Sequence, residues 1–264
     1  MNTIFVKELK RTRIGLIIWS VIVALVALMG IMEYPVLGQS LNLIEEALEL
    51  IPKAGQLVFG VYNVNLNEPI GYFVVMYYWS GLVIFVHAIY MGASIISKES
   101  RDKTVEYLFT KPYPKSAIVT AKMLAALVNV LVVGLTATIM SLLAMIPTTS
   151  ERAAYGQVFA ACAGMLVTQV VLMTLGFLCS ALFKGYKAGV FSAAGVLLFS
   201  YCLMFFVQYI DEPQLNFLSP LTFFGVSEVV RDGLDLIYVL LSAAIIALCV
   251  YFTHRLYAKK EMIT

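Results

Sequence analysis

Two histidines and four cysteines are the side chains of this sequence that most readily serve acid–base, redox or metal chemistry. His87 falls in the middle of one long apolar segment and His254 at the end of another, so they do not form one site, and a histidine hydrogen-bonded within a bundle is the simpler interpretation of His87. No cysteine lies in a CxxC pair or beside a histidine; the four are Cys162, Cys179, Cys202 and Cys249. No GxxxxGK[ST] phosphate-binding loop occurs. We therefore expect neither a catalytic site nor a metal site, and no ATP site of this kind.

The longest charged stretch of the chain runs from Ser97 to Lys122, SKESRDKTVEYLFTKPYPKSAIVTAK. A short amphipathic helix is predicted within it, because apolar residues recur there at i, i+3 and i+4; these are Val105, Leu108 and Phe109. Thr104 is a suitable N-cap, and Pro112 and Pro114 end this helix and prepare the next one. A short amphipathic helix that faces water between two apolar segments has a shape suited to docking onto a soluble partner.

The composition predicts an all-α integral membrane protein. Hydrophobic residues make up 61% of the 264 residues and charged residues 13%, and the mean hydropathy is +0.89. Each crossing of the hydrocarbon core needs about 20 apolar residues, so the chain holds six spans in a single domain covering residues 1–264. The predicted segments are an interfacial helix at 1–13, spans at about 15–32, 71–96, 118–146, 157–183, 188–210 and 233–253, and a charged loop at 97–117.

Charge placement orients these six spans. If they alternate in direction, fifteen of the eighteen lysines and arginines fall on one side, and the other side holds only Lys53, Arg152 and Arg231. The positive-inside rule then places both termini and the 97–117 loop in the cytoplasm. The opposite side carries an acidic amphipathic helix over Leu41–Ile51, and an apolar patch at Phe217–Val226 that dips into the membrane or lies on it. The span interiors hold almost no ionisable residue apart from His87, which disfavours coupling to protons or sodium.

The segment from Ile96 to Lys122, together with the six-span layout, resembles the permease subunits of type-2 ABC transporters, the ABC exporter permease family. The positions that match the family pattern are Glu99, Thr104, Glu106, Leu108, Pro112 and Lys122. Lys103 stands where a glycine is usual, and the customary arginine near Lys115–Ser116 is a lysine. We expect Glu99 to pair with Arg101, Lys103 or the interfacial helix, and Lys122 to snorkel to the membrane interface.

This resemblance implies a mechanism and a set of partners. Thr104–Thr110, including Val105 and Phe109, would form a cytoplasmic coupling helix seated on a separate ABC ATPase subunit that binds ATP and Mg, with no cofactor in this chain. Two ATPase copies and a second permease, identical or paralogous, would complete the complex in a prokaryotic plasma membrane. Nucleic acid is not an expected partner.

The resemblance also implies a substrate path, because the second and fifth spans face the partner permease in exporters of this family. The resulting path residues are Tyr77, Tyr78, Phe85, Phe199, Tyr201 and Phe205. Ordinary packing or lipid-facing aromatics are the competing interpretation. Aromatic- and methionine-rich spans without fixed charge suit an amphipathic peptide, antibiotic or lipid. Glycan export is the second candidate, and a sensor or scaffold subunit without transport is the alternative from another class.

Overall fold

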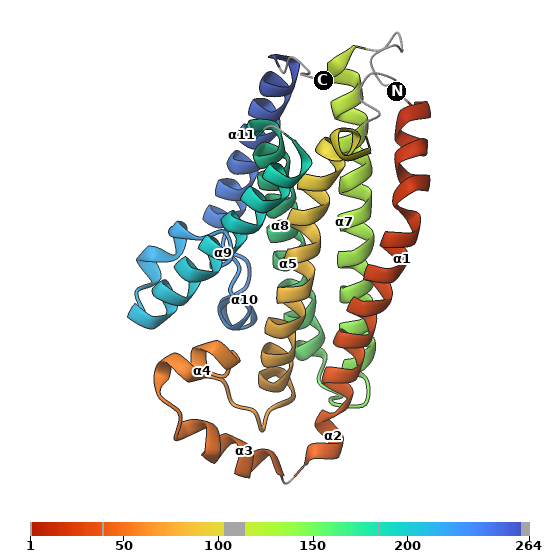
Figure 1. Cartoon of the computed structure of the whole chain (residues 1–264). Helices are drawn as coiled ribbons and strands as arrows, with labels where there is room; N and C mark the ends of the chain where they lie inside the picture. Colours follow the sequence, from red (N-terminus) through yellow and green to blue (C-terminus); the bar gives the residue numbers. More distant parts are fainter. Residues whose placement is uncertain (1, 39, 103–113, 184, 260–264) are drawn as a thin grey trace.

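The computed structural model describes residues 2–38, 40–102, 114–183 and 185–259. Within these residues the chain is helical and has no strand, and six helices are long and apolar enough to cross a membrane. They are α1 (Asn2–Met32), α5 (Pro69–Asp102), α7 (Lys115–Met145), α8 (Arg152–Leu182), α9 (Tyr186–Ile210) and α11 (Leu236–Lys259). Figure 1 shows them packed side by side as one bundle. The predictions of an all-α fold and of six spans are confirmed.

The two ends of the bundle differ in charge and in structure. Helix α1 begins and α11 ends at the same end, where α5 also ends and α7 begins (Figure 1). We call this the basic end, because α1, α7 and α11 carry lysines and arginines there. At the opposite, acidic end lie the short helices α2 (Tyr34–Leu37), α3 (Ser40–Glu49), α4 (Lys53–Phe59), η1 (Pro213–Leu218) and α10 (Val226–Asp232).

Helices α5 and α8 form the centre of the bundle and are its most buried spans. Glycines permit their close approach: a Cβ on Gly92 of α5 would lie 2.0 Å from the Met173 carbonyl oxygen of α8, and one on Gly176 of α8 would lie 2.4 Å from the Ile89 carbonyl oxygen. Helices α1 and α11 are the least buried spans, so their large apolar side chains face the bilayer or another chain. The core therefore lies along the α5–α8 seam.

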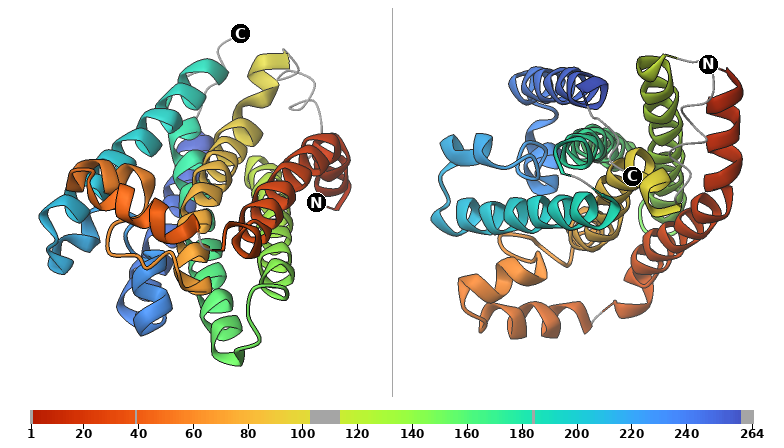
Figure 2. Two further views of the ribbon diagram at one scale, coloured as in Figure 1. Left: turned by 90° about the horizontal axis from the view of Figure 1, so that it is seen from below. Right: turned by 45° about the horizontal axis from the view of Figure 1, so that its top comes forward.

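A small cap covers part of the acidic end. The predicted acidic amphipathic helix is present as α3, and its Leu41 packs with Leu66, Tyr72 and Val75 in a buried cluster. The Asn67 side-chain amide donates a hydrogen bond to the Glu45 carboxylate, so the loop after α4 is tied to α3. The segment between α9 and α11 folds as η1 and α10, with Phe223 and Phe224 buried and Phe217 exposed. Figure 2 shows α2, α3 and α4 to one side of the long helices.

Several boundaries differ from the sequence-based prediction; α8 begins at Arg152 instead of 157, for example, and α11 ends at Lys259 instead of 253. Helix α1 runs without a break from Asn2 to Met32, so the helix expected at 1–13 is continuous with the first span. Helix α5 continues to Asp102, six residues beyond the predicted end of the second span, which shortens the loop expected at 97–117. The helix continues because Ser97 and Lys98 are buried, with the Ser97 hydroxyl donating to the Ala93 carbonyl and Lys98 paired with Glu8 of α1. Helix α7 begins at Lys115, directly after Pro114 and three residues before the expected start of the third span.

Candidate functional site

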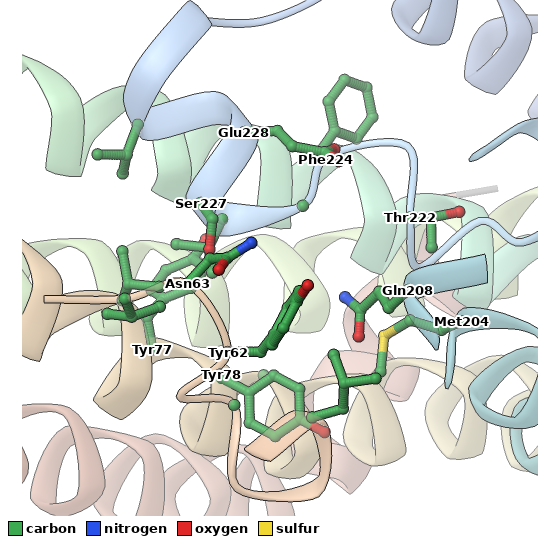
Figure 3. Close-up of a pocket in the computed structure, with 18 of the residues that line it drawn as sticks. Tyr62, Asn63, Tyr77, Tyr78, Met204, Gln208, Thr222, Phe224, Ser227 and Glu228 are labelled. Carbon is green, nitrogen blue, oxygen red and sulfur yellow. The ribbon is translucent and has the colours of Figure 1, made fainter. Parts of the chain in front are cut away.

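A cavity of about 540 Å³ lies at the acidic end, between α5 and α9, and residues of α4, η1 and α10 also line it. We call it the aromatic cavity. Its volume is in the range of sites that hold small molecules. Figure 3 shows the Tyr62 ring inside it, between the side chains of Asn63 and Gln208, with Tyr78 and Met204 nearby. Segments from both halves of the chain therefore line the cavity.

Apolar and aromatic side chains from three spans form the cavity wall. Helix α5 contributes Tyr77, Tyr78 and Phe85, helix α8 contributes Met165, and helix α9 contributes Tyr201 and Met204. The buried Tyr77 hydroxyl donates to the Ala161 carbonyl of α8, which fixes its ring. Gly60 ends α4 at φ +71°, and a Cβ there would lie 2.7 Å from the Tyr78 ring, so only glycine lets α4 rest on this wall.

Four of the six residues expected along a substrate path meet at this cavity: Tyr77, Tyr78, Phe85 and Tyr201. Phe199 does not, because it is 64% exposed on another face of α9. At 3.6 residues per turn, the two positions from 199 to 201 rotate by about 200°, which places Phe199 nearly opposite Tyr201. Phe205 packs against the main core cluster and does not line the cavity.

Sequence reasoning missed the methionines of the wall and the polar residues of the mouth. One face of α9 carries Tyr201 and, at i+3, i+7 and i+10 from it, Met204, Gln208 and Asp211. A search for aromatic residues alone finds only Tyr201 on this face. Tyr62 lies in the loop after α4, and no periodic pattern marks it.

Carboxylates dominate the mouth of the cavity. Four line it, namely Glu68, Asp211, Glu212 and Glu228, against one guanidinium, that of Arg231. The Arg231 side chain is engaged with Asp232 at 2.9 Å, an interaction that raises the Arg231 pKa. Burial against the cavity wall raises the pKa of Glu228, whose carboxylate accepts a hydrogen bond from Asn216 at 3.3 Å. The mouth is thus net negative above an aromatic interior.

A second polar cluster joins three spans near the basic end. Lys98 of α5 forms a buried ion pair with Glu8 of α1. The Lys122 ammonium of α7 donates to the Ile95 carbonyl of α5 at 3.1 Å, and Asn129 of α7 donates to Thr12 of α1 at 3.2 Å. These contacts fix α1, α5 and α7 to one another next to the connection between α5 and α7.

This cluster corrects the expectation that Lys122 snorkels to the membrane interface. Lys122 is completely buried, because its ammonium reaches a backbone carbonyl of the neighbouring span instead of water. A pair between the charged stretch and the N-terminal segment was expected at Glu99; the described link between α1 and α5 is Glu8 with Lys98. The Glu99 side chain lies outside the described residues, as do Thr104, Val105, Glu106, Leu108, Phe109 and Pro112.

His87 lies deep in the bundle, fully buried, with its ring centroid 5.1 Å from that of Trp19 in α1. Neither ring nitrogen has a hydrogen-bond partner among the described residues, so the hydrogen bond expected for it is not present there. Across the described ranges no group of three or more histidine, cysteine or acidic side chains is placed to hold a metal ion.

Residues 2–261 match the family model described as ABC-2 family transporter protein. No curated protein gives a significant match to the chain.

Proposed function

The chain belongs to the ABC-2 family of transporter proteins, and from this premise we propose that it is the membrane-spanning subunit of an ATP-driven exporter. It moves an amphipathic molecule, such as a peptide, an antibiotic or a lipid-like compound, out of the cell. Energy comes from a separate cytoplasmic ATPase subunit that carries ATP and Mg. ABC-2 members are membrane components of transporters and are not themselves catalytic, so the work must come from such a partner.

One observation carries this proposal: the aromatic cavity and the connection between α5 and α7 lie at opposite ends of the same helix. Tyr77 and Tyr78 of α5 line the cavity, whereas Lys98 of α5 is paired with α1 at the other end. An exporter requires this separation, because ATP is consumed on one side of the membrane and the substrate leaves on the other. The excess of lysine and arginine at the basic end supports a cytoplasmic position for it.

The complex contains two ATPase subunits and a second permease, identical or paralogous. Residues 104–110 form the coupling helix that sits in a groove of the ATPase. The buried contacts of Lys98 and Lys122 support this role, since they hold α1, α5 and α7 as one unit. ATPase closure then moves the three spans together.

The test is ATP turnover by this chain reconstituted with a candidate ABC ATPase, for example one found in an adjacent reading frame. Thr104→Arg places a charge in the docking helix and lowers substrate-stimulated turnover by about tenfold or more, because a buried unpaired charge at an interface is costly. Glu99→Ala lowers it less. The matched control is Ala188→Arg, which adds the same side chain at an exposed position of α9 at the same end.

Retention of normal turnover and co-purification by Thr104→Arg refutes the coupling role of residues 104–110. Association with the ATPase without any stimulated turnover favours a sensor or scaffold subunit instead. Stimulation by oligosaccharides, and not by amphipathic compounds, favours glycan export.

A further inference from the structure

A lysine of the chain itself marks a position for a positive charge at the rim of the aromatic cavity. The Lys53 ammonium lies 4.6 Å from the centroid of the Tyr62 ring and 5.9 Å from that of Tyr209. The same nitrogen is 3.8 Å from the Asp211 carboxylate. An ammonium over aromatic faces and beside a carboxylate is the arrangement by which proteins recognise organic cations.

The Lys53 contacts are weak enough to be exchanged. The Lys53 side chain remains 31% exposed and that of Asp211 62% exposed, so water competes for both charges. Two members of this group, Tyr62 and Asp211, also line the cavity, and the Tyr62 hydroxyl donates to Asp211 at 3.4 Å. A cation that enters the cavity can therefore reach the same tyrosine and carboxylate that Lys53 contacts.

The interior of the cavity suits the apolar part of such a molecule. The wall presents two aromatic rings and a thioether, those of Tyr78, Phe85 and Met204. Contact between these groups and an apolar ligand excludes water, which favours binding without imposing one orientation on the ligand. The Tyr201 hydroxyl is buried and has no hydrogen-bond partner among the described residues, so the wall also offers a polar contact. At the mouth, the carboxylates of Glu68, Asp211, Glu212 and Glu228 repel an anion.

We propose that the aromatic cavity binds an amphipathic organic cation, with its apolar body between α5 and α9 and its positive group against Tyr62 and Asp211, where it displaces the Lys53 ammonium. This inference rests on the proposed function for the transport step and gives its substrate class; binding is a property of this chain alone. Lys53 acts as a tethered competitor that holds α4 over the cavity until the cation arrives.

The test uses two ions of the same shape and opposite charge. Tetraphenylphosphonium and tetraphenylborate are titrated into the full chain in lipid nanodiscs, and binding to empty nanodiscs is subtracted. We expect saturable binding of the phosphonium and at least about tenfold weaker binding of the borate, because the rim carries several carboxylates. Equal affinity for the two ions overturns the proposal, as does the absence of saturable phosphonium binding.

Two substitutions locate the site. Asp211→Asn weakens phosphonium binding about threefold or more, which is the scale of one partly exposed ion pair. Lys53→Met strengthens it by a similar factor, because the competing ammonium is gone. A gain of affinity is not a consequence of misfolding, so Lys53→Met keeps the test decisive if Asp211→Asn proves unstable.

The matched control is Glu151→Gln, which removes a carboxylate at the acidic end that does not line the cavity. It leaves phosphonium affinity unchanged. If Glu151→Gln weakens binding as much as Asp211→Asn does, or if Lys53→Met has no effect, the cation is attracted only by the general surface charge and the proposed site is wrong.

The two proposals fail separately. If phosphonium binds as expected and no ATPase associates with the chain, the cation site stands and the exporter assignment falls. If the ATPase assembles and turns over while the phosphonium does not bind, the substrate class is wrong and the exporter assignment stands.

Discussion

The Glu228 carboxyl links the chemistry of the cavity mouth to pH. Burial raises its pKa above the ordinary 4.5, nearby Asp232 and Asp211 raise it further, and the Asn216 amide and Arg231 guanidinium oppose this. Glu228 therefore becomes neutral at a higher pH than an ordinary glutamate. As pH falls, protonation of Glu228 removes negative charge from the mouth, and attraction for a cation decreases.

We expect phosphonium affinity to fall as pH is lowered from neutrality, because protonation of Glu228 removes negative charge from the cavity mouth. The tetraphenylphosphonium charge does not titrate, so the change reports on the protein. Binding isotherms at a series of pH values measure it. Glu228→Gln has lower affinity at neutral pH and a flatter profile, whereas Glu151→Gln keeps the wild-type profile. A wild-type slope in Glu228→Gln would assign the titration to another group.

At the scale of elements, the seam between α5 and α8 determines whether the cavity keeps its shape. Gly92→Ala places a methyl carbon 2.0 Å from the Met173 carbonyl oxygen. Because this oxygen belongs to the backbone of α8, the clash can be relieved only by moving one helix away from the other. We expect a loss of about 1–3 kcal/mol, the usual cost of overpacking. Thermal unfolding in the same detergent measures it as a lower midpoint.

The control for Gly92→Ala is Gly195→Ala. A Cβ at Gly195 of α9 meets no atom within 4 Å, so alanine there is neutral or slightly stabilising through its better helix propensity. Equal effects of the two substitutions would contradict close backbone packing at the seam. Phosphonium affinity should also fall in Gly92→Ala, because Phe85 and Tyr78 of the same helix move with it.

The spans could be predicted from sequence because hydropathy over about 20 residues is a local signal. The C-terminal end of α5 could not, because Lys98 resembles a loop residue until its partner is known, and Glu8 lies ninety positions earlier in the chain. Lys122 was misread for the same reason: its partner is the backbone carbonyl of Ile95 in another span, which carries no side-chain signal.

The aromatic cavity was only partly predictable. The family resemblance pointed to aromatic residues of α5 and α9, but that choice ignored the face of each helix, so it included Phe199, which does not lie on the face of α9 that lines the cavity. The cation group was not predictable, because Lys53, Tyr62 and Asp211 belong to segments about 150 residues apart that only the fold brings together.

For the whole molecule, α5 connects the two ends of the bundle, as α1, α7 and α8 also do. Its 34 residues form one uninterrupted helix, about 50 Å long at 1.5 Å per residue. Near the basic end it carries the Lys98 pair with α1, and at the acidic end it carries Tyr77 and Tyr78. A rigid helix held at both ends transmits a displacement as a tilt or a shift, so in the proposed complex we expect ATPase closure at one end to alter the cavity at the other.

Cysteine labelling tests this coupling. Gln208→Cys places a thiol on the α9 wall of the cavity, in a Cys202→Ser background that removes the exposed native cysteine. Bound phosphonium covers this thiol, so we expect it to slow the reaction of the thiol with a water-soluble maleimide about threefold, the factor expected above for loss of one partly exposed ion pair. With the ATPase bound, ATP and vanadate change the same rate at least about twofold, because α5 moves relative to α9. Glu151→Cys reacts at one rate throughout.

Two results would distinguish cation binding in the cavity from movement of the cavity during the ATPase cycle. If phosphonium protects Gln208→Cys while ATP leaves its labelling unchanged in a complex that turns over normally, the cavity binds cations without taking part in the transport cycle. If ATP changes the labelling rate of Gln208→Cys when residue 92 is glycine but not when Gly92→Ala is also present, the displacement depends on the packing of α5 against α8. The second result is expected, because α5 can pass a movement to the cavity only while its packing against α8 keeps it from bending.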